Sequence, residues 1–480
     1  MSTLGIDLGT QSVRAIVLTD DGVIVGEGTA PLESVRTDGR HEQDPKAWWT
    51  AVVAAVHAAR ADLDASRIEA VAVDGTSGTI LLANADGAPM TPALMYDDVR
   101  ATAEADVVNR AGAEAWLANG YGRMQPAWAL PKWLWLRHHG PAADFDQARL
   151  LHQTDFINEA LVGGRVATDC STALKTGCDL VNVRWPLPLL ETLELPSRML
   201  PPLVEPGKPL GRLGARVATL LGLRAGVRVV AGMTDSCAAQ IGAGALIPGS
   251  WNCVLGTTLA LKGVSETLIR DPGGAMYSHR GPNGLWLPGG ASSSGAGILS
   301  ARLPNADLAA LGNAAAMRPD PTFFTYPLAG RGERFPFVAP DAESFSTGEP
   351  ADDVEAYAAM ALGLAFVERL CFDHLALLGA RTDGRISFTG GGARSDYWTQ
   401  LRADVLGRPV HRPRHAEPAV GMAMLAAGSS SRAVDEGVVN SPASQRHRAL
   451  LRTYGTFLDA IERRGWVSPV LIAHARRRAE

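Results

Sequence analysis

Short apolar runs that end in small polar turns occur twice in this chain in nearly the same arrangement. The first run, Leu4–Leu8, leads into the turn Gly9–Ser12 and then into a second apolar run, Val13–Leu18. Asp20, Asp21 and Gly22 turn the chain again before the short run Val23–Val25. This pattern predicts three antiparallel strands joined by turns.

A similar arrangement lies about half the chain length further on. Trp251–Leu255 is apolar, Gly256–Thr258 is a small polar turn, and Leu259–Leu261 is apolar again. Each half of the chain is therefore predicted to carry one hairpin with a Gly-Thr turn. Two such hairpins facing one another would hold a nucleotide from both sides, as in a duplicated two-lobe ATPase. The P-loop pattern G-x-x-x-x-G-K-[ST] does not occur in the sequence.

The remaining apolar pattern predicts strands that alternate with helices. Asp44 is a good N-cap and Pro45 suits the first helical turn, so a helix is predicted from Pro45 to Leu63. The charged run Met95–Arg100 is typical of a helix start, and residues 101–165 are predicted to be mainly helical. The other predicted elements are strands at Ile68–Val73, Val227–Asp235 and Arg385–Thr389, a helix starting at Cys237, and helices at Val354–Leu378, Asp396–Leu406 and Ala419–Gly428. Alternating strands and helices predict an α/β fold.

Length and charge narrow the class of protein. A chain of 480 residues is longer than one hydrophobic core usually supports, so we expect two domains, 1–243 and 244–480, joined near the loose stretch Gly242–Gly249. The net charge of −5 and the dispersed Lys and Arg argue against a nucleic-acid or membrane-surface protein, and Arg476–Arg478 is predicted to cap the last helix. No signal peptide or membrane span is recognisable, so a soluble, cytoplasmic protein is expected.

Cysteine and histidine spacing indicates neither a disulfide framework nor a metal site. The five cysteines are odd in number and widely spaced, and buried free thiols are their predicted state. His411 and His415 have the spacing of a helical zinc pair, but Pro413 between them prevents the helix that such a pair requires. A surface loop is predicted there.

The polar turn after the first predicted strand carries candidate chemistry. Thr10, Gln11 and Ser12 offer side-chain donors beside backbone N–H groups, and Gly9 lets a ligand approach closely, so this turn is a candidate phosphate cradle. Asp7 at the strand end is a candidate for Mg²⁺, which prefers carboxylate and phosphate oxygens. On these residues alone, an ordinary hairpin with a polar turn explains the pattern equally well.

Three further segments add candidate ligand groups. The turn Asp74–Thr79, with the sequence DGTSGT, follows a predicted buried strand and is either a ligand wall or a tight strand connection. Asp235 is predicted at a strand end beside a helix N-terminus, where a carboxylate can act as a base on a ligand. The glycines of Gly390–Gly392 suit close packing of a planar ring against backbone. A glycine triplet alone is weak evidence for such a site, because many unrelated turns contain one.

In their order and separation, four of these segments resemble the FGGY family of carbohydrate kinases. They are Asp7-x-Gly9-Thr10, Thr234-Asp235, Gly256-Thr257-Thr258 and Gly390-Gly391-Gly392-Ala393. The resemblance covers roughly residues 1–430 and implies an actin-like, hexokinase-like fold of two lobes, each a ribonuclease H-like mixed sheet flanked by helices. It implies ATP and Mg²⁺ as cofactors and a small sugar as substrate, and we expect a monomer or homodimer.

The resemblance also implies roles for residues of this chain. It implies that Asp235 is the general base for the sugar hydroxyl and that Asp7 assists catalysis by supporting Mg²⁺, with Asp235 also near the metal. The implied ATP-binding residues are Thr10, Gln11, Ser12, Gly256, Thr257, Thr258, Gly391, Gly392, Ser395 and Trp398. The implied sugar-binding residues are Asp7, Thr76, Ser77, Asp98 and Asp235.

Within the family, the sequence is most similar to the D-ribulose kinases of cyanobacteria and plants, which are sometimes labelled xylulokinase-like. Xylulokinases carry Met-His and glycerol kinases Arg-Glu where this chain has Thr76-Ser77, so a ketopentose, D-ribulose, is the predicted substrate. D-Xylulose or another sugar or polyol is the alternative. The family motif W-x-D-x-R has Tyr in place of Trp here, as Tyr96-x-Asp98-x-Arg100. The shared segments are Asp74–Thr79, Thr234–Ser236, Tyr277–His279, Gly289–Ser292 and Arg331–Pro336.

Two other classes of protein fit part of the pattern. A non-catalytic actin-like ATPase would use the same phosphate turns but would need no sugar-site turn, so Asp235 together with Asp74–Thr79 favours a kinase. A Rossmann dehydrogenase would need G-x-G-x-x-G after the first strand, and this pattern is absent there.

Overall fold

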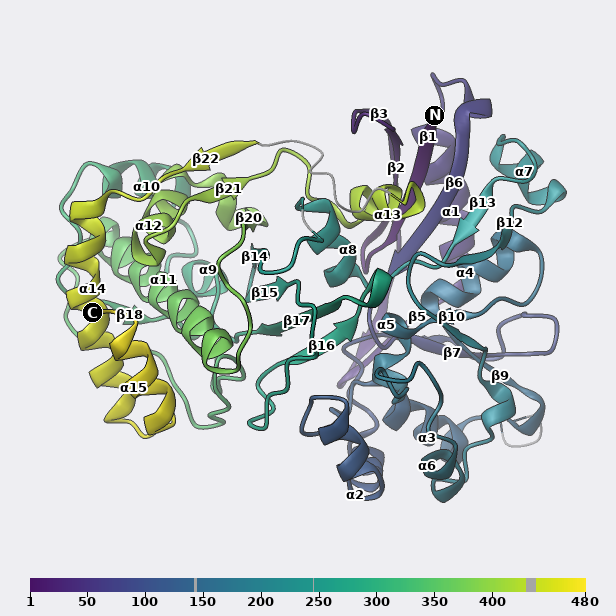
Figure 1. Cartoon of the computed structure of the whole chain (residues 1–480), viewed down its shortest axis with the longest axis horizontal. Coiled ribbons are helices and arrows are strands. Elements are labelled where there is room, and N and C mark those ends of the chain that lie inside the picture. Colours follow the sequence, from purple (N-terminus) through teal and green to yellow (C-terminus); the bar gives the residue numbers. More distant parts are fainter. Residues whose placement is uncertain (142–144, 245, 429–436) are drawn as a thin grey trace. The chain divides into compact units, whose positions relative to one another are not determined.

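The computed structural model describes residues 1–141, 145–244, 246–428 and 437–480. Its chain forms two compact units, each assembled from separate stretches of sequence (Figure 1). Unit 1 comprises Met1–Leu246, His279–Leu287 and His415–Val434, and unit 2 comprises Ile247–Ser278, Pro288–Arg414 and Asp435–Glu480. Ala245, inside the predicted junction, lies outside the described residues.

The main sheet of unit 1 has the strand order β12-β13-β6-β1-β2-β3. Strands β1, β2 and β3 pair antiparallel in sequence order, which confirms the predicted meander. Strand β1 also pairs parallel with β6, and β6 pairs parallel with β13. The strands are β1 Ser2–Leu8, β2 Ser12–Thr19, β3 Ile24–Pro31, β6 Ile68–Gly75, β12 Pro209–Arg212 and β13 Arg228–Val230.

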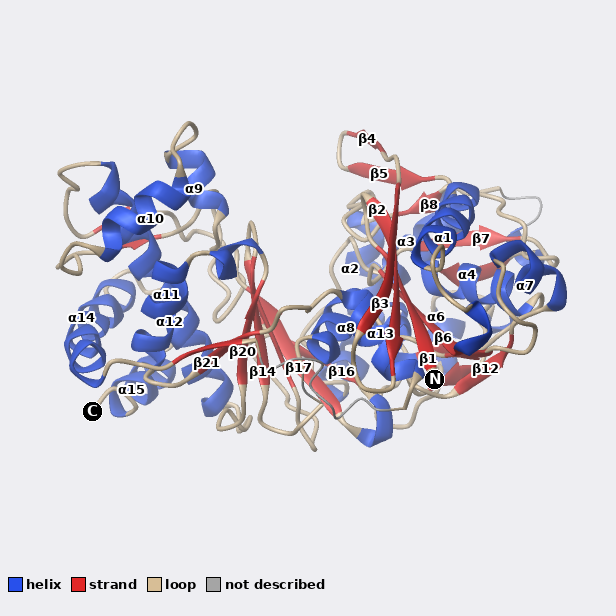
Figure 2. Ribbon diagram, turned by 90° about the horizontal axis from the view of Figure 1, so that it is seen from above, coloured by secondary structure: helices blue, strands red, loops and turns tan. Residues whose placement is uncertain are grey.

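A second sheet in unit 1 has the order β4-β5-β8-β7-β9, and both sheets are accompanied by helices (Figure 2). Its strands are β4 Val35–Thr37, β5 Arg40–Gln43, β7 Ile80–Ala83, β8 Ala93–Leu94 and β9 Arg149–His152. A short pair, β10 Thr168–Asp169 with β11 Leu203–Val204, is parallel. The helices are α1 Pro45–Ala59, α2 Thr102–Ala118, α3 Ala129–His139, α4 Gln153–Val162, α5 Cys170–Ala173, α6 Leu187–Thr192, α7 Ala215–Leu221, α8 Asp235–Gly242 and α13 Pro418–Ala426.

Helix α13 is far from β1 in sequence but packs directly against it (Figure 1). The Thr3 hydroxyl donates a hydrogen bond of 2.8 Å to the Ala423 carbonyl. A Cβ on Gly5 would lie only 1.8 Å from the Ala419 carbonyl oxygen, so glycine is required for this approach. Another close approach, between Gly421 and the Ala238 carbonyl, brings α13 against α8. Helix α13 is therefore enclosed by other elements of unit 1, in accord with its apolar sequence.

Unit 2 repeats the scheme of unit 1. Its seven-stranded sheet has the order β16-β17-β15-β14-β20-β21-β22, in which β14 pairs antiparallel with β15 and parallel with β20. The strands are β14 Trp251–Leu255, β15 Leu259–Gly263, β16 Tyr277–Arg280, β17 Trp286–Ala291, β20 Ile386–Thr389, β21 Val410–Arg412 and β22 Val438–Asn440, with a separate pair of β18 Thr325–Tyr326 and β19 Phe345–Ser346. The helices are α9 Gly297–Arg302, α10 Leu308–Ala316, α11 Asp353–Leu377, α12 Asp396–Leu406, α14 Ser444–Glu462 and α15 Pro469–Arg477.

Several predicted elements need correction. Helix α1 ends at Ala59 rather than Leu63, because Arg60 leaves the helical conformation with φ −103° and ψ 1°. Met95–Arg100 does not start a helix, since its Asp98 carboxylate binds His41 and Arg100 instead, and α2 begins at Thr102. His411 lies in strand β21 and not in a surface loop.

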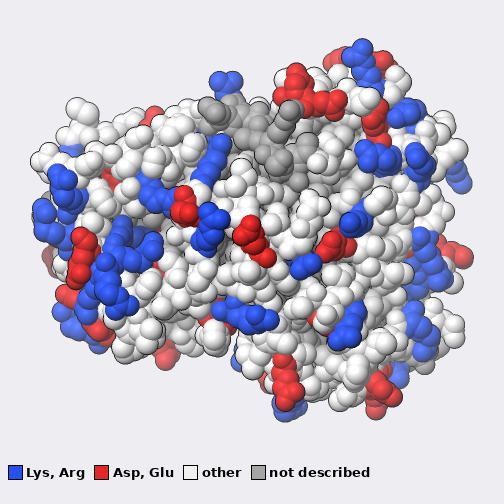
Figure 3. All heavy atoms as spheres, viewed as in Figure 1, with Lys and Arg blue, Asp and Glu red and all other residues white. Residues whose placement is uncertain are grey.

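Other predictions from composition agree with the structure. All five cysteines are free and buried. Basic and acidic side chains are interspersed on the face drawn in Figure 3. None of the described helices combines the length and apolar character needed to cross a membrane.

Candidate functional site

Strand register in unit 1 brings three aspartates together. In the parallel pair of β1 and β6, Asp7 lies opposite Asp74. One residue further along, Gly75 forms a parallel bridge with Thr234, which directly precedes Asp235. Because the carboxyl ends of adjacent parallel strands meet at one sheet edge, the side chains of Asp7, Asp74 and Asp235 are neighbours.

Burial and mutual repulsion perturb the two carboxylates on the strands. Burial raises the pKa of Asp7 to about 6, with a lowering contribution from its hydrogen bond to Asp74 and a raising one from Asp235. Burial, followed by the charge of Asp7, holds the pKa of Asp74 well above its usual range. Neither Asp74 oxygen receives a hydrogen bond from any N–H or hydroxyl donor of the described residues. Burial and the charge of Asp7 therefore favour the protonated, neutral form of Asp74 in the free protein.

These carboxylates suit Mg²⁺ bound together with phosphate. Within the described ranges, no group of three or more His, Cys, Asp or Glu side chains could by itself hold a metal ion. Mg²⁺ usually keeps several waters and binds one or two carboxylates plus substrate phosphates, so a complete protein cage is not needed. Asp7 and Asp235 fit this requirement, and Asp74, whose pKa is raised by burial and by the charge of Asp7, lies beside Asp7.

The turn after β1 is fixed through its backbone, while its side chains stay accessible. Gly9 N–H donates to the Ser12 carbonyl at 3.1 Å, which closes the turn. The Gln43 amide donates to the Thr10 carbonyl at 2.7 Å and accepts from the Trp48 indole at 2.6 Å. The Thr10 hydroxyl is hydrogen-bonded to Tyr96, whose pKa is raised by burial and by Asp97. Gln11 is exposed and Thr10 and Ser12 are partly exposed, so the turn is accessible to a phosphate.

The turn Asp74–Thr79 is preorganised except at one hydroxyl. The Thr76 N–H and hydroxyl both donate to Gln153 Oε1 at 2.8 Å, and the Thr76 and Thr79 hydroxyls are 2.6 Å apart. Lys175 Nζ donates to the Ser77 carbonyl at 2.8 Å. The Ser77 hydroxyl is buried and has no hydrogen-bond partner among the described residues. A buried hydroxyl without a partner is costly, so this position is suited to a polar ligand.

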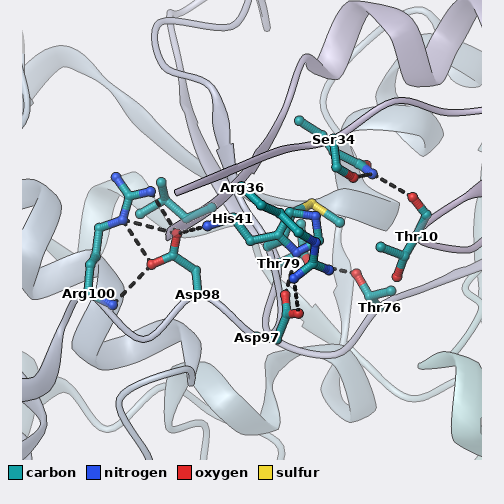
Figure 4. Close-up of polar contacts among 12 residues, drawn as sticks. Thr10, Ser34, Arg36, His41, Thr76, Thr79, Asp97, Asp98 and Arg100 are labelled. Atoms are coloured by element: carbon teal, nitrogen blue, oxygen red, sulfur yellow. Dashed lines mark hydrogen bonds and ion pairs between the residues drawn. The ribbon is translucent and has the colours of Figure 1, made fainter. Parts of the chain in front are cut away.

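Charged residues of the segment 96–100 form two networks that both include His41 (Figure 4). Asp98 is fully buried and accepts hydrogen bonds from the His41 N–H at 2.8 Å and from the Arg100 guanidinium at 2.7–3.0 Å. Asp97 instead faces the His41 ring at 2.5 Å and Arg36 at 2.9 Å. The Asp98 carboxylate is thus occupied by protein donors, and its predicted contact with sugar stays a prediction.

Asp235 is held by a helix rather than by a strand. Strand β13 ends at Val230, and Asp235 is the first residue of α8, one position later than the N-cap Thr234. The predicted strand over Val227–Asp235 is therefore too long. The Thr234 N–H donates to the Ser171 hydroxyl at 3.2 Å, which fixes the chain just before Asp235. A carboxylate in the first turn of a helix is favoured by the helix dipole.

In unit 2, the turn Gly256–Thr258 is bonded to the following Ser-rich turn. The backbone N–H groups of Ala296 and Gly297 donate to the Gly256 and Thr257 carbonyls at 2.9 and 3.1 Å. A Cβ on Gly295 would lie 2.3 Å from the Thr257 carbonyl oxygen, so the two turns are in direct contact. Thr257 itself is exposed. The turn is rigid in its backbone and open at its side chains.

Glu333, which sequence reasoning did not select, organises that Ser-rich turn. Its buried carboxylate accepts hydrogen bonds of 2.6–3.0 Å from the Ser292 and Ser294 hydroxyls, the Ser293 N–H and the Tyr326 hydroxyl. One carboxylate thus orders the segment on which Gly256–Thr258 rests. Its serine partners lie 39 to 41 residues away in sequence, so the segment Arg331–Pro336 by itself does not indicate this role for Glu333.

The predicted adenosine-binding residues of unit 2 lie in and after the 3-10 turn Gly391–Arg394. Gly391 has open space where a side chain would be, whereas a Cβ on Gly392 would clash with Leu255 at 2.4 Å. The Ser395 hydroxyl caps α12 by accepting from the Trp398 N–H at 3.2 Å. The Trp398 ring is 3% exposed and packs in the core of unit 2. ATP contacts by these residues stay predictions.

Comparison with known proteins identifies the family. The N-terminal domain of the FGGY family of carbohydrate kinases matches residues 2–242, and its C-terminal domain matches residues 245–430. The chain belongs to the FGGY family of carbohydrate kinases. This FGGY kinase is 30% identical to the xylulose kinase of Streptomyces coelicolor, over 96% of the chain and 93% of that relative. It is 28% identical to the xylulose kinase of Escherichia coli, over 95% and 96% of the two chains.

Solved structures confirm the predicted fold class. The xylulose kinase of Rhodospirillum rubrum has a TM-score of 0.85 and 27% identity, over 96% of this chain and 98% of that chain. The actin-like, hexokinase-like fold predicted from the motifs is therefore correct. ATP is the phosphate donor of such kinases, and the reaction class of this FGGY kinase is phosphate transfer to a sugar.

Sequence reasoning named Asp7 and Asp235 as site residues but left out Asp74. The signal for Asp74 was present, because Asp is the penultimate residue of both β1 and β6. Gln43 carries no such signal, since its three side-chain partners, Thr10, Ser34 and Trp48, lie in different segments. The segment Asp74–Thr79 was selected, and the structure brings its first residue beside Asp7.

Proposed function

We propose that this FGGY kinase transfers the γ-phosphate of ATP to the terminal hydroxyl of a ketopentose, with D-ribulose as the preferred substrate and D-ribulose 5-phosphate as product. The observation that carries this proposal is the buried, unpartnered Ser77 hydroxyl in the turn that directly follows Asp74. It offers one donor and acceptor to a sugar beside a group of carboxylates.

Different residues of unit 1 have different roles in the reaction. Asp235, in the first turn of α8, accepts the proton of the sugar hydroxyl as its oxygen attacks the γ-phosphorus. Thr10, Gln11 and Ser12 bind phosphate oxygens through side-chain and backbone donors. Asp7 and Asp235 would hold Mg²⁺, which when bound would supply charge neutralisation of the phosphates.

Selectivity for D-ribulose rests on the size and chemistry of Ser77. D-Ribulose and D-xylulose differ only at C3, so a group that contacts the middle of the sugar must tell them apart. A short hydroxyl leaves room there, whereas the imidazole of xylulokinases fills the space. A mismatched buried hydroxyl costs about 1–3 kcal/mol, or roughly 5- to 150-fold in kcat/KM.

A second candidate substrate is D-xylulose. The relatives that match this chain over nearly its whole length are named xylulose kinases. Their printed names favour the same reaction on the other C3 epimer. The roles of Asp235 and of the phosphate turn would be the same for either sugar.

A coupled assay of ADP release decides between the two substrates. Purified protein is offered D-ribulose, D-xylulose, L-ribulose and glycerol at several concentrations with saturating ATP and Mg²⁺, and kcat/KM is compared. D-Ribulose is expected to exceed D-xylulose by the factor given above. The highest kcat/KM on any of the other three would reject the ribulose assignment and leave the kinase assignment intact.

The variant Ser77→Ala tests the residue that carries the argument. It should reduce the ratio of D-ribulose to D-xylulose kcat/KM several-fold while KM for ATP stays nearly constant. Thr219→Ala, which removes an exposed hydroxyl on α7, is the matched control and should leave the ratio unchanged. An unaltered ratio of D-ribulose to D-xylulose kcat/KM in Ser77→Ala would show that another group distinguishes the configuration at C3.

A further inference from the structure

Unit 1 contains a pocket of about 710 Å³ that includes none of the proposed catalytic, phosphate-binding or sugar-binding residues. Its walls are α1, the turn after β7, Arg149 on β9, and α4 with the loop that follows it. This volume is within the range of small-molecule sites. The pocket, here called the α1–α4 pocket, has no part in the reaction described above.

The charges of the α1–α4 pocket leave a positive balance. Arg149 and Glu159 are both buried and neutralise each other through two hydrogen bonds. Lys46 in the first turn of α1 and Arg165 after α4 are exposed, against one exposed acid, Asp86. The Nη2 of Arg165 donates a hydrogen bond of 3.1 Å to the Ala85 carbonyl, and this contact directs the guanidinium toward the turn after β7. The cationic groups favour an anion.

Two aromatic rings complete the wall. Trp49 on α1 and Phe156 on α4 are each partly buried and line the pocket. Phe156 is fixed from behind by Trp48, in an edge contact with ring centroids 6.2 Å apart. Aromatic faces beside cations suit a ligand that has a flat apolar part and an anionic group.

The pocket is connected to the sugar-site turn by elements that reach both. Helix α4 begins with Gln153, which holds the N–H and hydroxyl of Thr76, and its C-terminal half lines the pocket. Strand β7 starts at Ile80, directly after the turn Asp74–Thr79, and leads to the pocket turn. A displacement of α4 by a ligand would therefore move the Gln153 acceptor that orders Thr76.

We propose that the α1–α4 pocket is a regulatory site for a small organic anion with an aromatic or similarly flat face, and that its occupation changes the affinity for the sugar. The coupling rests on the proposed role of the Asp74–Thr79 turn, but the binding itself does not. Allosteric couplings typically change affinity about 5- to 150-fold.

Phenyl phosphate is the probe, with inorganic phosphate and benzyl alcohol representing its two halves. Ligand-observed saturation-transfer NMR on the purified protein should give a Kd on the order of 1 mM for phenyl phosphate, as expected for a ligand of this size. Benzyl alcohol, observed directly, and inorganic phosphate, which has no carbon-bound protons and is tested as a competitor of phenyl phosphate, should each bind at least tenfold more weakly. Lys46→Ala and Arg165→Ala should each weaken phenyl phosphate severalfold, and Arg110→Ala, an exposed arginine on α2, should not.

A second variant tests the location without removing charge. Ala160→Phe places a ring on the α4 wall of the pocket and should abolish binding of the probe. In the kinase assay, saturating phenyl phosphate should change KM for the ketopentose about fivefold or more in wild type and not in Ala160→Phe.

Binding that persists in Lys46→Ala, Arg165→Ala and Ala160→Phe would overturn the site. Binding confined to the pocket without any change in sugar KM would overturn the regulatory role. An inactive protein that still binds the probe at this pocket would refute the proposed function and leave the site standing.

Discussion

The carboxylate of Asp7 should lower the stability of the ligand-free protein at neutral pH, and Asp7→Asn should relieve this cost. In the folded protein the pKa of Asp7 is raised from 3.8 to about 6, with burial as the largest cause. Each unit of pKa shift corresponds to about 1.4 kcal/mol. The full shift would be worth about 3 kcal/mol, and partial exposure of the side chain reduces this to about 2 kcal/mol.

The sign of the pH dependence follows from proton linkage. Between about pH 4 and 6, the folded protein binds the Asp7 proton more strongly than the unfolded chain does, so stability falls as pH rises through this window. Above it, the ionised carboxylate destabilises the fold by a constant amount. Asn has no proton to lose, so the advantage of Asp7→Asn should be about 2 kcal/mol at pH 8 and under about 1 kcal/mol at pH 4.5.

Thermal unfolding in a metal chelator measures this difference. For a unit of this size, 1 kcal/mol corresponds to roughly 2 °C in Tm, so Asp7→Asn should melt about 4 °C above wild type at pH 8. Asp106→Asn, an exposed carboxylate on α2, should show no such gain. Activity should be largely lost in Asp7→Asn. A variant less stable than wild type at pH 8, or a gain that is the same at both pH values, would refute the reasoning.

Three further predictions follow from the contacts described. Asp235→Asn keeps the shape of the side chain but removes the base, so kcat should fall by ~10²–10⁴. The affinity for ATP, measured by calorimetry, should be nearly unchanged, and retention of about a tenth of the activity would contradict the role of Asp235 as the base. Glu333→Gln loses hydrogen bonds to a charged group, so KM for ATP should rise roughly tenfold and KM for the sugar should rise less. The control Glu343→Gln should change neither KM. Gly5→Ala should lower the free energy of unfolding by about 3 kcal/mol or more, because the new Cβ meets the backbone of α13, and the loss should appear as a lower Tm or as insoluble protein. The control Gly330→Ala places its Cβ in open space and should leave the stability unchanged.

The sequence allowed the hairpins, the long helices and the fold class to be predicted because each has a local pattern. The run Val354–Leu378 predicted α11 to within one residue at each end, and Asp396–Leu406 predicted α12 without error. The turns Gly9–Ser12 and Gly256–Thr258 were also found in place. Alternating apolar runs, caps and small turn residues are enough for such elements.

The features that the sequence did not predict depend on contacts between distant parts of the chain. The parallel register that sets Asp74 opposite Asp7 cannot be read from either strand alone, so only two of the three carboxylates were selected. Met95–Arg100 was predicted as a helix start from its charges, but the Asp98 carboxylate binds the N–H of His41 in strand β5 and the guanidinium of Arg100. Glu333 was missed because its hydrogen-bond partners lie at other places in the sequence.

The position of helix α13 has a consequence for how the protein is made. The first unit lacks part of its interior until Pro418–Ala426 has left the ribosome, which is roughly 170 residues after Leu246. At about 5–20 residues per second, this delay lasts roughly 10–35 s. During that interval the side of β1 around Gly5 has no covering helix, and the nascent chain carries an apolar face that chaperones can bind. A fragment cut after Leu246 would keep that face permanently, and co-expression with a segment containing α13 should restore its solubility.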